Sequence, residues 1–213
     1  MKWPKCLAGL VVFLSPVTIQ FILLLPGTLK LRPHYRRTTV EGVTTLDDAV
    51  HACRRTGLQD WDLVAYAQHL VARKFAIYST RNLWDTPARA FEYGMGYCTQ
   101  YNLALKHLLD RLGFDTEAVF AQKVRVLSNP NWTLGHTWLR VTVQDEVREV
   151  CASYVMNEPG RNNFEPLTPV HHGNDLILLL MHLGMLPFCG FVEWRALLSG
   201  QGDPGWTFLR KQT

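Results

Sequence analysis

Two long apolar runs bracket a chain whose middle alternates between helical and strand-like patterns. The first run covers residues 6–25, twenty positions without a charged side chain, and basic residues stand on both sides of it. A run of that length is sufficient to cross a bilayer as a helix. A cleaved signal peptide is the competing interpretation, although no small-x-small cleavage site follows, and a buried soluble helix ranks third. We therefore predict an N-terminal hydrophobic membrane anchor over residues 1–30.

The second apolar run covers residues 176–192 near the C-terminus. Pro187 interrupts it, and it also contains His182 and two glycines. Its seventeen residues are few for a span, so the pattern favours a core helix or a helix lying in the membrane surface over a second crossing. The predicted product is a single-pass membrane-anchored protein. Basic residues near both ends of the first run leave open the side of the membrane on which the domain lies.

Residues 31–213 are predicted to form one α+β domain that ends in the hydrophobic helical extension. Helical spacing and capping residues predict one helix over residues 46–55 and another over residues 61–74, with Asp60 as the cap of the second. A third helix is expected from about Cys98 to a stop at Gly113. Alternation and turn residues predict strands over residues 114–127, 135–143 and 147–152.

Charge and cysteine content exclude several classes of function. The formal net charge is only +4, and no basic face interleaved with aromatic residues is present, so no nucleic-acid partner is expected. The five cysteines are widely spaced and odd in number, which gives neither a disulfide framework nor a paired-ligand zinc motif. We predict no cofactor and no metal. Cys53 and Cys189 are expected to be small buried hydrophobes.

The candidate chemistry lies at Cys98 and His136. A thiol in the first turn of a helix feels the positive end of the helix dipole, which favours the thiolate. His136 lies on the predicted strand over residues 135–143 and would supply the imidazole that such a nucleophile needs. Counting in twos from His136 places Trp138 on its face and the more apolar set, including Leu139 and Val141, on the core face.

These segments resemble the transglutaminase-like superfamily of cysteine acyltransferases and proteases. The matching runs are Tyr-Gly-Met-Gly-Tyr-Cys at 93–98, Gly-His-Thr-Trp at 135–138 and Leu-Trp-Asp-Thr-Pro at 83–87. The resemblance covers roughly residues 60–152. It implies a papain-like layout, with a central helix that carries the cysteine packed on an antiparallel sheet. It also implies a thioester mechanism on peptide or amide bonds, ending in hydrolysis or in transfer to an acceptor amine.

The chain departs from that family at the third catalytic position. Where the family has an aspartate that orients the histidine, this chain has Cys151 in the run Val-Cys-Ala-Ser at 150–153. Loss of such a carboxylate can reduce turnover by several orders of magnitude. Cys151 is predicted to contact the imidazole in its place. Glu149 shares a strand face with Cys151 and is an alternative carboxylate, although an exposed pair with Arg140 is the simpler interpretation.

We therefore predict a membrane-anchored cysteine enzyme whose catalytic residues are Cys98, His136 and Cys151. Three aromatic residues are predicted to line the substrate site: Trp84, Tyr97 and Trp138. The expected partners are a peptide or protein substrate and membrane lipid, contacted through the N-terminal helix.

Three alternatives remain open at this point. In the first, the site is catalytically degenerate and the module binds peptide or protein at the membrane. In the second, Cys98, His136 and Cys151 hold a zinc ion with an open coordination position. In the third, Cys98 and Cys151 form a reversible disulfide, which would require the intervening imidazole to move.

Overall fold

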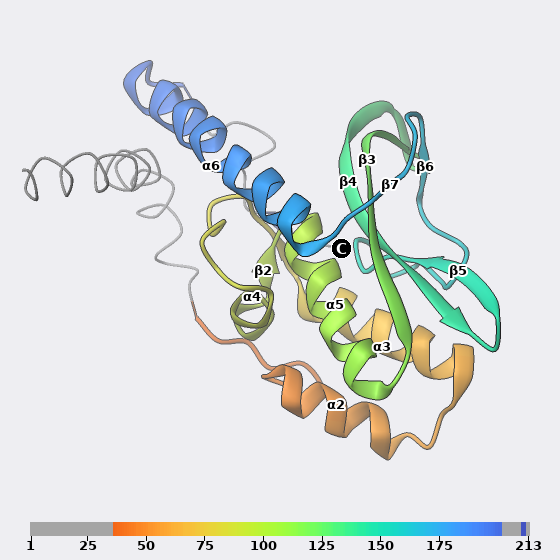
Figure 1. The fold of residues 1–213 in the computed structure, drawn as a ribbon. Coiled ribbons are helices and arrows are strands. Elements are labelled where there is room, and N and C mark those ends of the chain that lie inside the picture. Colours follow the sequence, from red (N-terminus) through yellow and green to blue (C-terminus); the bar gives the residue numbers. More distant parts are fainter. Residues whose placement is uncertain (1–35, 202–209, 212–213) are drawn as a thin grey trace, which may run out of the picture.

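The computed structural model describes residues 36–201 and 210–211, which form a mixed α+β structure (Figure 1). The predicted anchor at residues 1–30 lies outside these residues. The helices are α2 (Leu46–Arg55), α3 (Asp60–Lys74), α4 (Pro87–Tyr93), α5 (Cys98–Leu112) and α6 (Asp175–Leu198). The strands are β1 (Ile77–Tyr78), β2 (Met95–Gly96), β3 (Asp115–Val126), β4 (Asn129–Val143), β5 (Glu146–Val150), β6 (Phe164–Pro166), β7 (His171–His172) and β8 (Arg210–Lys211).

The larger sheet is antiparallel and curled, with strand order β5-β4-β3-β6 and with β7 also paired to β3. Helix α5 packs on one of its faces, and α2 and α3 pack against α5 (Figure 1). The main core lies between these layers, where Leu105 and Leu109 of α5 belong to the same buried cluster as Leu139 and Val141 of β4. The opposite face carries a smaller cluster that includes Trp138, Cys151 and Phe164. The alternation predicted from His136 is therefore confirmed, because Trp138 and Leu139 enter different clusters.

Helix boundaries follow the local capping chemistry, with one correction. The cap predicted before residue 46 is present as a capping box, since Thr45 Oγ1 accepts from the Asp48 N–H at 3.1 Å and Asp48 accepts from the Thr45 N–H at 2.8 Å. Asp60, however, does not cap α3. It is the first residue of that helix, and Gln59 occupies the cap position without a side-chain hydrogen bond.

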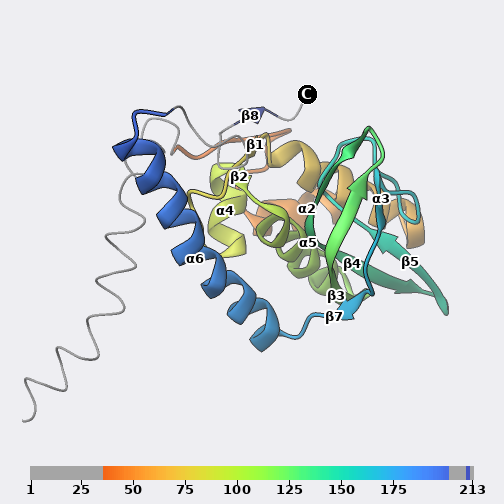
Figure 2. The ribbon, with the colours of Figure 1, turned by 90° about the horizontal axis from the view of Figure 1, so that it is seen from above.

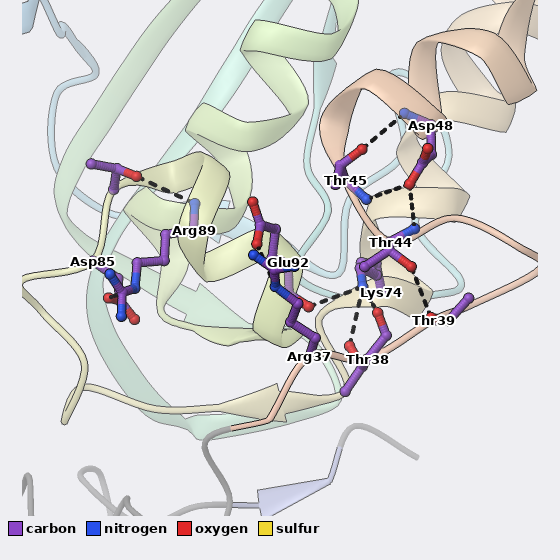
Figure 3. Close-up of polar contacts among 11 residues, drawn as sticks. Arg37, Thr38, Thr39, Thr44, Thr45, Asp48, Lys74, Asp85, Arg89 and Glu92 are labelled. Carbon is purple, nitrogen blue, oxygen red and sulfur yellow. Dashed lines mark hydrogen bonds and ion pairs between the residues drawn. The ribbon is translucent and has the colours of Figure 1, made fainter.

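A buried lysine fixes the chain that leads to the candidate site (Figure 3). The Lys74 ammonium donates to the Thr38 carbonyl, to the Thr38 hydroxyl at 3.1 Å and to the Glu92 carbonyl at 3.3 Å. It thereby joins the segment before α2 to the C-terminal end of α4. Gly94 ends α4 in the left-handed region at φ +64°, where an added Cβ would lie 2.6 Å from the Lys74 carbonyl oxygen. Glycine is needed at this turn because both the backbone conformation and the space exclude a side chain.

Helix α6 is longer than the apolar run that predicted it. It continues through Pro187 to Leu198 and lies at the edge of the molecule, on the far side of α5 from the larger sheet (Figures 1 and 2). Residues 176–198 are long and apolar enough to cross a membrane, and only 28% of the most apolar window is buried in the structure. One stripe of α6, formed by Leu178, Leu186, Cys189, Glu193 and Ala196, is buried.

Candidate active site

Cys98 is the first residue of α5, and hydrogen bonds of the neighbouring residues hold the start of this helix in place. Tyr97 caps the helix in an extended conformation, and its N–H donates to Gln100 Oε1 at 3.2 Å. The Gln100 amide donates in turn to the carbonyls of Asn82 and Asp85, at 2.9 and 3.0 Å. Gly96 admits this side chain, because a Cβ at that residue would lie 2.8 Å from Gln100 Oε1. These hydrogen bonds thus attach the loop that carries Trp84 to the start of α5.

His136 lies on β4 with only 7% of its surface exposed. Its ring stacks on Trp138, with centroids 6.0 Å apart and an interplanar angle of 17°, and Phe164 meets it edge-on at 4.7 Å. These aromatic contacts hold the plane of the imidazole. The ring atom Nε2 lies 3.3 Å from Cys151 Sγ, so the structure brings together two of the three predicted catalytic side chains.

The partners of Cys151 determine which imidazole nitrogen carries the proton. The Cys151 thiol donates to Ser153 Oγ at 3.1 Å, and its sulfur accepts from Asn102 Nδ2 at 3.4 Å. With the thiol proton directed at Ser153, the sulfur faces Nε2 as an acceptor, and we therefore assign the imidazole proton to Nε2. His136 Nδ1 is then unprotonated, and it is buried without a hydrogen-bond partner among the described residues.

Asn102 separates two strands at this point. In the register of β4 with β5, Thr137 and Ala152 would be direct partners, but β5 ends at Val150. The buried Asn102 side chain lies there instead: Nδ2 donates to the Thr137 carbonyl at 2.6 Å, and Oδ1 accepts from the Ala152 N–H at 2.9 Å. We call this arrangement the Asn102 wedge. It satisfies backbone groups that would otherwise be buried without partners.

The wedge also locates Cys98. Residues 98 and 102 are one helical turn apart and therefore share a face of α5. Thr99 Oγ1, in the same helical turn as Cys98, lies 3.2 Å from Oγ1 of Thr137, the residue next to His136. The first turn of α5 thus contacts β4 beside His136, at the position where the strands part.

Burial changes the expected charge state of the site. It raises the pKa of the Cys98 thiol above its ordinary value, and hydrogen bonding from the Thr137 backbone opposes this only in part. It also lowers the pKa of His136 to about 4 and raises the pKa of Cys151 to about 11. Desolvation disfavours whichever form is charged. Burial therefore favours a neutral thiol and a neutral imidazole near pH 7, in contrast to the thiolate expected from the helix dipole alone.

The three aromatic residues predicted to line the substrate site differ in their burial and in their contacts. Trp84 is 42% exposed on the loop held by Gln100, whereas Trp138 is fully buried behind the imidazole. Tyr97 is nearly buried, and its hydroxyl lies 2.7 Å from His182 Nδ1 of α6. Their proposed role in lining a substrate site stays a prediction. Glu149 pairs with Arg140 at 3.7 Å, in agreement with the simpler interpretation of that residue.

The alternative chemistries find little support in the same geometry. Among the described residues, no group of three or more histidine, cysteine, aspartate or glutamate side chains is suited to hold a metal ion. Cys98 and Cys151 are both free thiols.

Sequence reasoning missed four polar residues of the site: Gln100, Asn102, Ser153 and His182. The helical spacing of residues 98 and 102 was the available signal for Asn102. Gln100 lies two residues after Cys98 and is only 2% exposed, and nothing in the local sequence distinguishes it from a solvated side chain. The other two act through contacts with residues distant in space or across a loop, which periodicity cannot reveal.

Comparison with known proteins adds no relative to this description. No protein-family model matches the chain, and no curated protein matches it.

Replacing Asn102 with leucine tests the wedge. The variant leaves the Thr137 carbonyl and the Ala152 N–H buried without partners, so the free energy of unfolding in urea should fall by about 3 kcal/mol. Asn129→Leu removes an exposed amide from the same sheet and is expected to change it by less than about 0.5 kcal/mol. An equal effect of the two substitutions would contradict the assigned role of Asn102.

Proposed function

We propose that this protein is a membrane-anchored cysteine enzyme of the transglutaminase-like type, which acts on peptide or amide bonds through a thioester on Cys98. The observation that carries the proposal is the orientation of His136. Nε2–H is engaged by Cys151, and Nδ1 is buried without a hydrogen-bond partner among the described residues, beside the strand segment that contacts Cys98. A base of this kind is what a neutral thiol needs in order to react.

The reaction begins with proton transfer. As Cys98 Sγ attacks the substrate carbonyl carbon, its proton passes to His136 Nδ1, and the carbonyl oxygen gains negative charge. Backbone N–H groups in the first turn of α5 are available to stabilise that oxyanion, because the first N–H groups of a helix have no partner within it.

Breakdown of the tetrahedral intermediate completes acylation. The carbon–nitrogen bond breaks, His136 returns its proton to the leaving amine, and an acyl thioester remains on Cys98. Water or an acceptor amine then attacks the thioester, with His136 again accepting a proton. Water gives hydrolysis, and an amine gives acyl transfer.

Two further features support the assignment. The cysteine opens a helix that packs on an antiparallel sheet carrying the histidine, which is the layout implied by the resemblance to the transglutaminase-like superfamily. The uncharged run over residues 6–25 supports attachment to a membrane. Peptide or protein amides at a membrane are therefore the proposed substrate class.

One observation favours a second candidate function, a catalytically degenerate module that binds peptide or protein at the membrane. A neutral thiol stands where an orienting carboxylate would stabilise the imidazolium, and Cys98 and His136 are only 8% and 7% exposed. A site that neither stabilises the charged pair nor opens to substrate would bind without turnover.

Acylation by p-nitrophenyl acetate distinguishes the two candidates. The full chain in detergent micelles is expected to release a burst of nitrophenolate and to carry an acetyl group on Cys98, identified by peptide mass spectrometry. Cys98→Ala should abolish the burst, and His136→Ala should slow it by at least about 10²-fold.

Cys53→Ala is the matched control, because it removes another buried free thiol that lies in the core. It should leave the burst unchanged. If Cys98 in the folded wild type reacts no faster than a free thiol in solution, the enzyme assignment fails and the binding module is favoured.

A further inference from the structure

We infer that α6 lies in the surface of a lipid bilayer, with its outer face in contact with the hydrocarbon. The outer face of α6 is defined by nine large apolar side chains that are exposed in the structure: Leu176, Ile177, Leu179, Leu180, Met181, Leu183, Phe191, Leu197 and Leu198. This inference goes beyond the proposed function and does not depend on chemistry at Cys98.

The distribution of polar groups on α6 is the reverse of that on a helix facing water. Residues 176–192 include no charged side chain, and Glu193 is turned inward. Glu193 pairs with Arg81 at 2.9 Å, with both side chains only 4% exposed. His182 also points inward, to the Tyr97 hydroxyl. His182 and Glu193 therefore contact the protein, and the exposed side chains between residues 176 and 191 are apolar. Arg195 is the exposed charged residue in the last turn of α6.

The same contacts determine how the helix meets the membrane. His182 and Glu193 are separated by about three turns, or roughly 16 Å of helix, and both are bound to the body of the domain. A helix fastened along its side over that distance cannot pass alone through a bilayer. It can lie in the plane of the interface with its outer face buried among acyl chains, as amphipathic surface helices do.

Chain length places a bilayer within reach of α6. The uncharged run ends at Leu25, and the described chain resumes at Arg36. The ten residues between them span at most about 35 Å when extended. The Thr38 N–H donates to the Glu92 carbonyl at 3.0 Å, so the chain is attached to the domain at the C-terminal end of α4. A bilayer that holds residues 6–25 therefore lies within reach of the domain that carries α6.

Photo-crosslinking to lipid tests the inference on the full chain. The protein is reconstituted in phosphatidylcholine vesicles that contain a diazirine-labelled phosphatidylcholine, irradiated and mapped by peptide mass spectrometry. Lipid adducts are expected on outer-face residues of α6. The double variant Leu180→Glu, Phe191→Glu should reduce adducts on this helix at least about tenfold, because it places two charges at the lipid contact.

The matched control is Val147→Glu, Met156→Glu, which alters two exposed apolar residues on and after β5. It should leave the adducts on α6 unchanged. Three results would overturn the inference: lipid adducts confined to other segments, crosslinks that join α6 of two copies, or crosslinks between α6 and residues 6–25 without lipid adducts on α6. The acylation of Cys98 is measured separately, so either proposal can fail while the other stands.

Discussion

Replacing Cys151 with aspartate is expected to accelerate alkylation of Cys98 by iodoacetamide at pH 7 by between about 10- and 10³-fold. The carboxylate would accept the Nε2 proton of His136, now directed at Cys151 Sγ from 3.3 Å, and would stabilise the imidazolium that forms when the thiol gives up its proton. Burial currently opposes that charge, since it lowers the pKa of His136 to about 4. A negative charge at the far nitrogen raises this pKa and favours the reactive thiolate.

The measurement follows the Cys98 peptide by mass spectrometry, so that the other thiols do not interfere. Cys151→Ser is the matched control, because it retains a small hydrogen-bonding side chain without the charge, and its alkylation rate should stay within a few-fold of the wild type. If a folded Cys151→Asp variant is alkylated at the wild-type rate, a charge next to His136 Nε2 does not change the reactivity of the Cys98 thiol.

Acid is expected to destabilise the protein through His136. An unfolded imidazole titrates near 6.5, whereas the folded one has a pKa of about 4, so the unfolded chain binds more protons between these values. Stability is therefore fully present above pH 6.5 and is lost as the pH falls toward 4. A shift of that size corresponds to at most about 3 kcal/mol in the free energy of unfolding.

Urea unfolding at pH 7, 6, 5 and 4 measures this dependence. His136→Gln should flatten the slope between pH 6.5 and 4, and His107→Gln, which removes an exposed imidazole from α5, should leave it as in the wild type. If both variants show the wild-type slope, His136 is not held neutral by burial and the proposed general base loses its physical basis.

The sequence predicts the scaffold of this site better than its electrostatics. Local chemistry determined where α5 begins and ends, because Cys98 follows a glycine-rich turn and Gly113 adopts a left-handed conformation at φ +94°. Strand alternation correctly separated Trp138 from Leu139. The helix dipole alone suggested a thiolate at Cys98. The free-energy cost of burying that charge depends on tertiary packing, and burial raises the pKa of the thiol.

Other differences have the same origin. Strand β4 begins at Asn129, not at residue 135, because its polar first part pairs with the end of β3 through an irregular register without any apolar alternation. The helix at α6 continues through Pro187, which the apolar run could not indicate. The hydrogen bonds of Asn102 and Ser153 join residues far apart in the sequence or across a loop, so they exist only once the helix and the strands have packed together.

The Asn102 wedge has a consequence for the order in which the chain acquires its structure. Since a side chain of α5 satisfies backbone groups on both sides of the gap, the strands cannot reach their final separation before that helix docks. Docking of α5 requires contacts between segments far apart in the sequence, which are slow to form. Asn102 therefore reaches the Thr137 carbonyl and the Ala152 N–H only once α5 has docked, and the gap between β4 and the chain after β5 takes its final form late in folding.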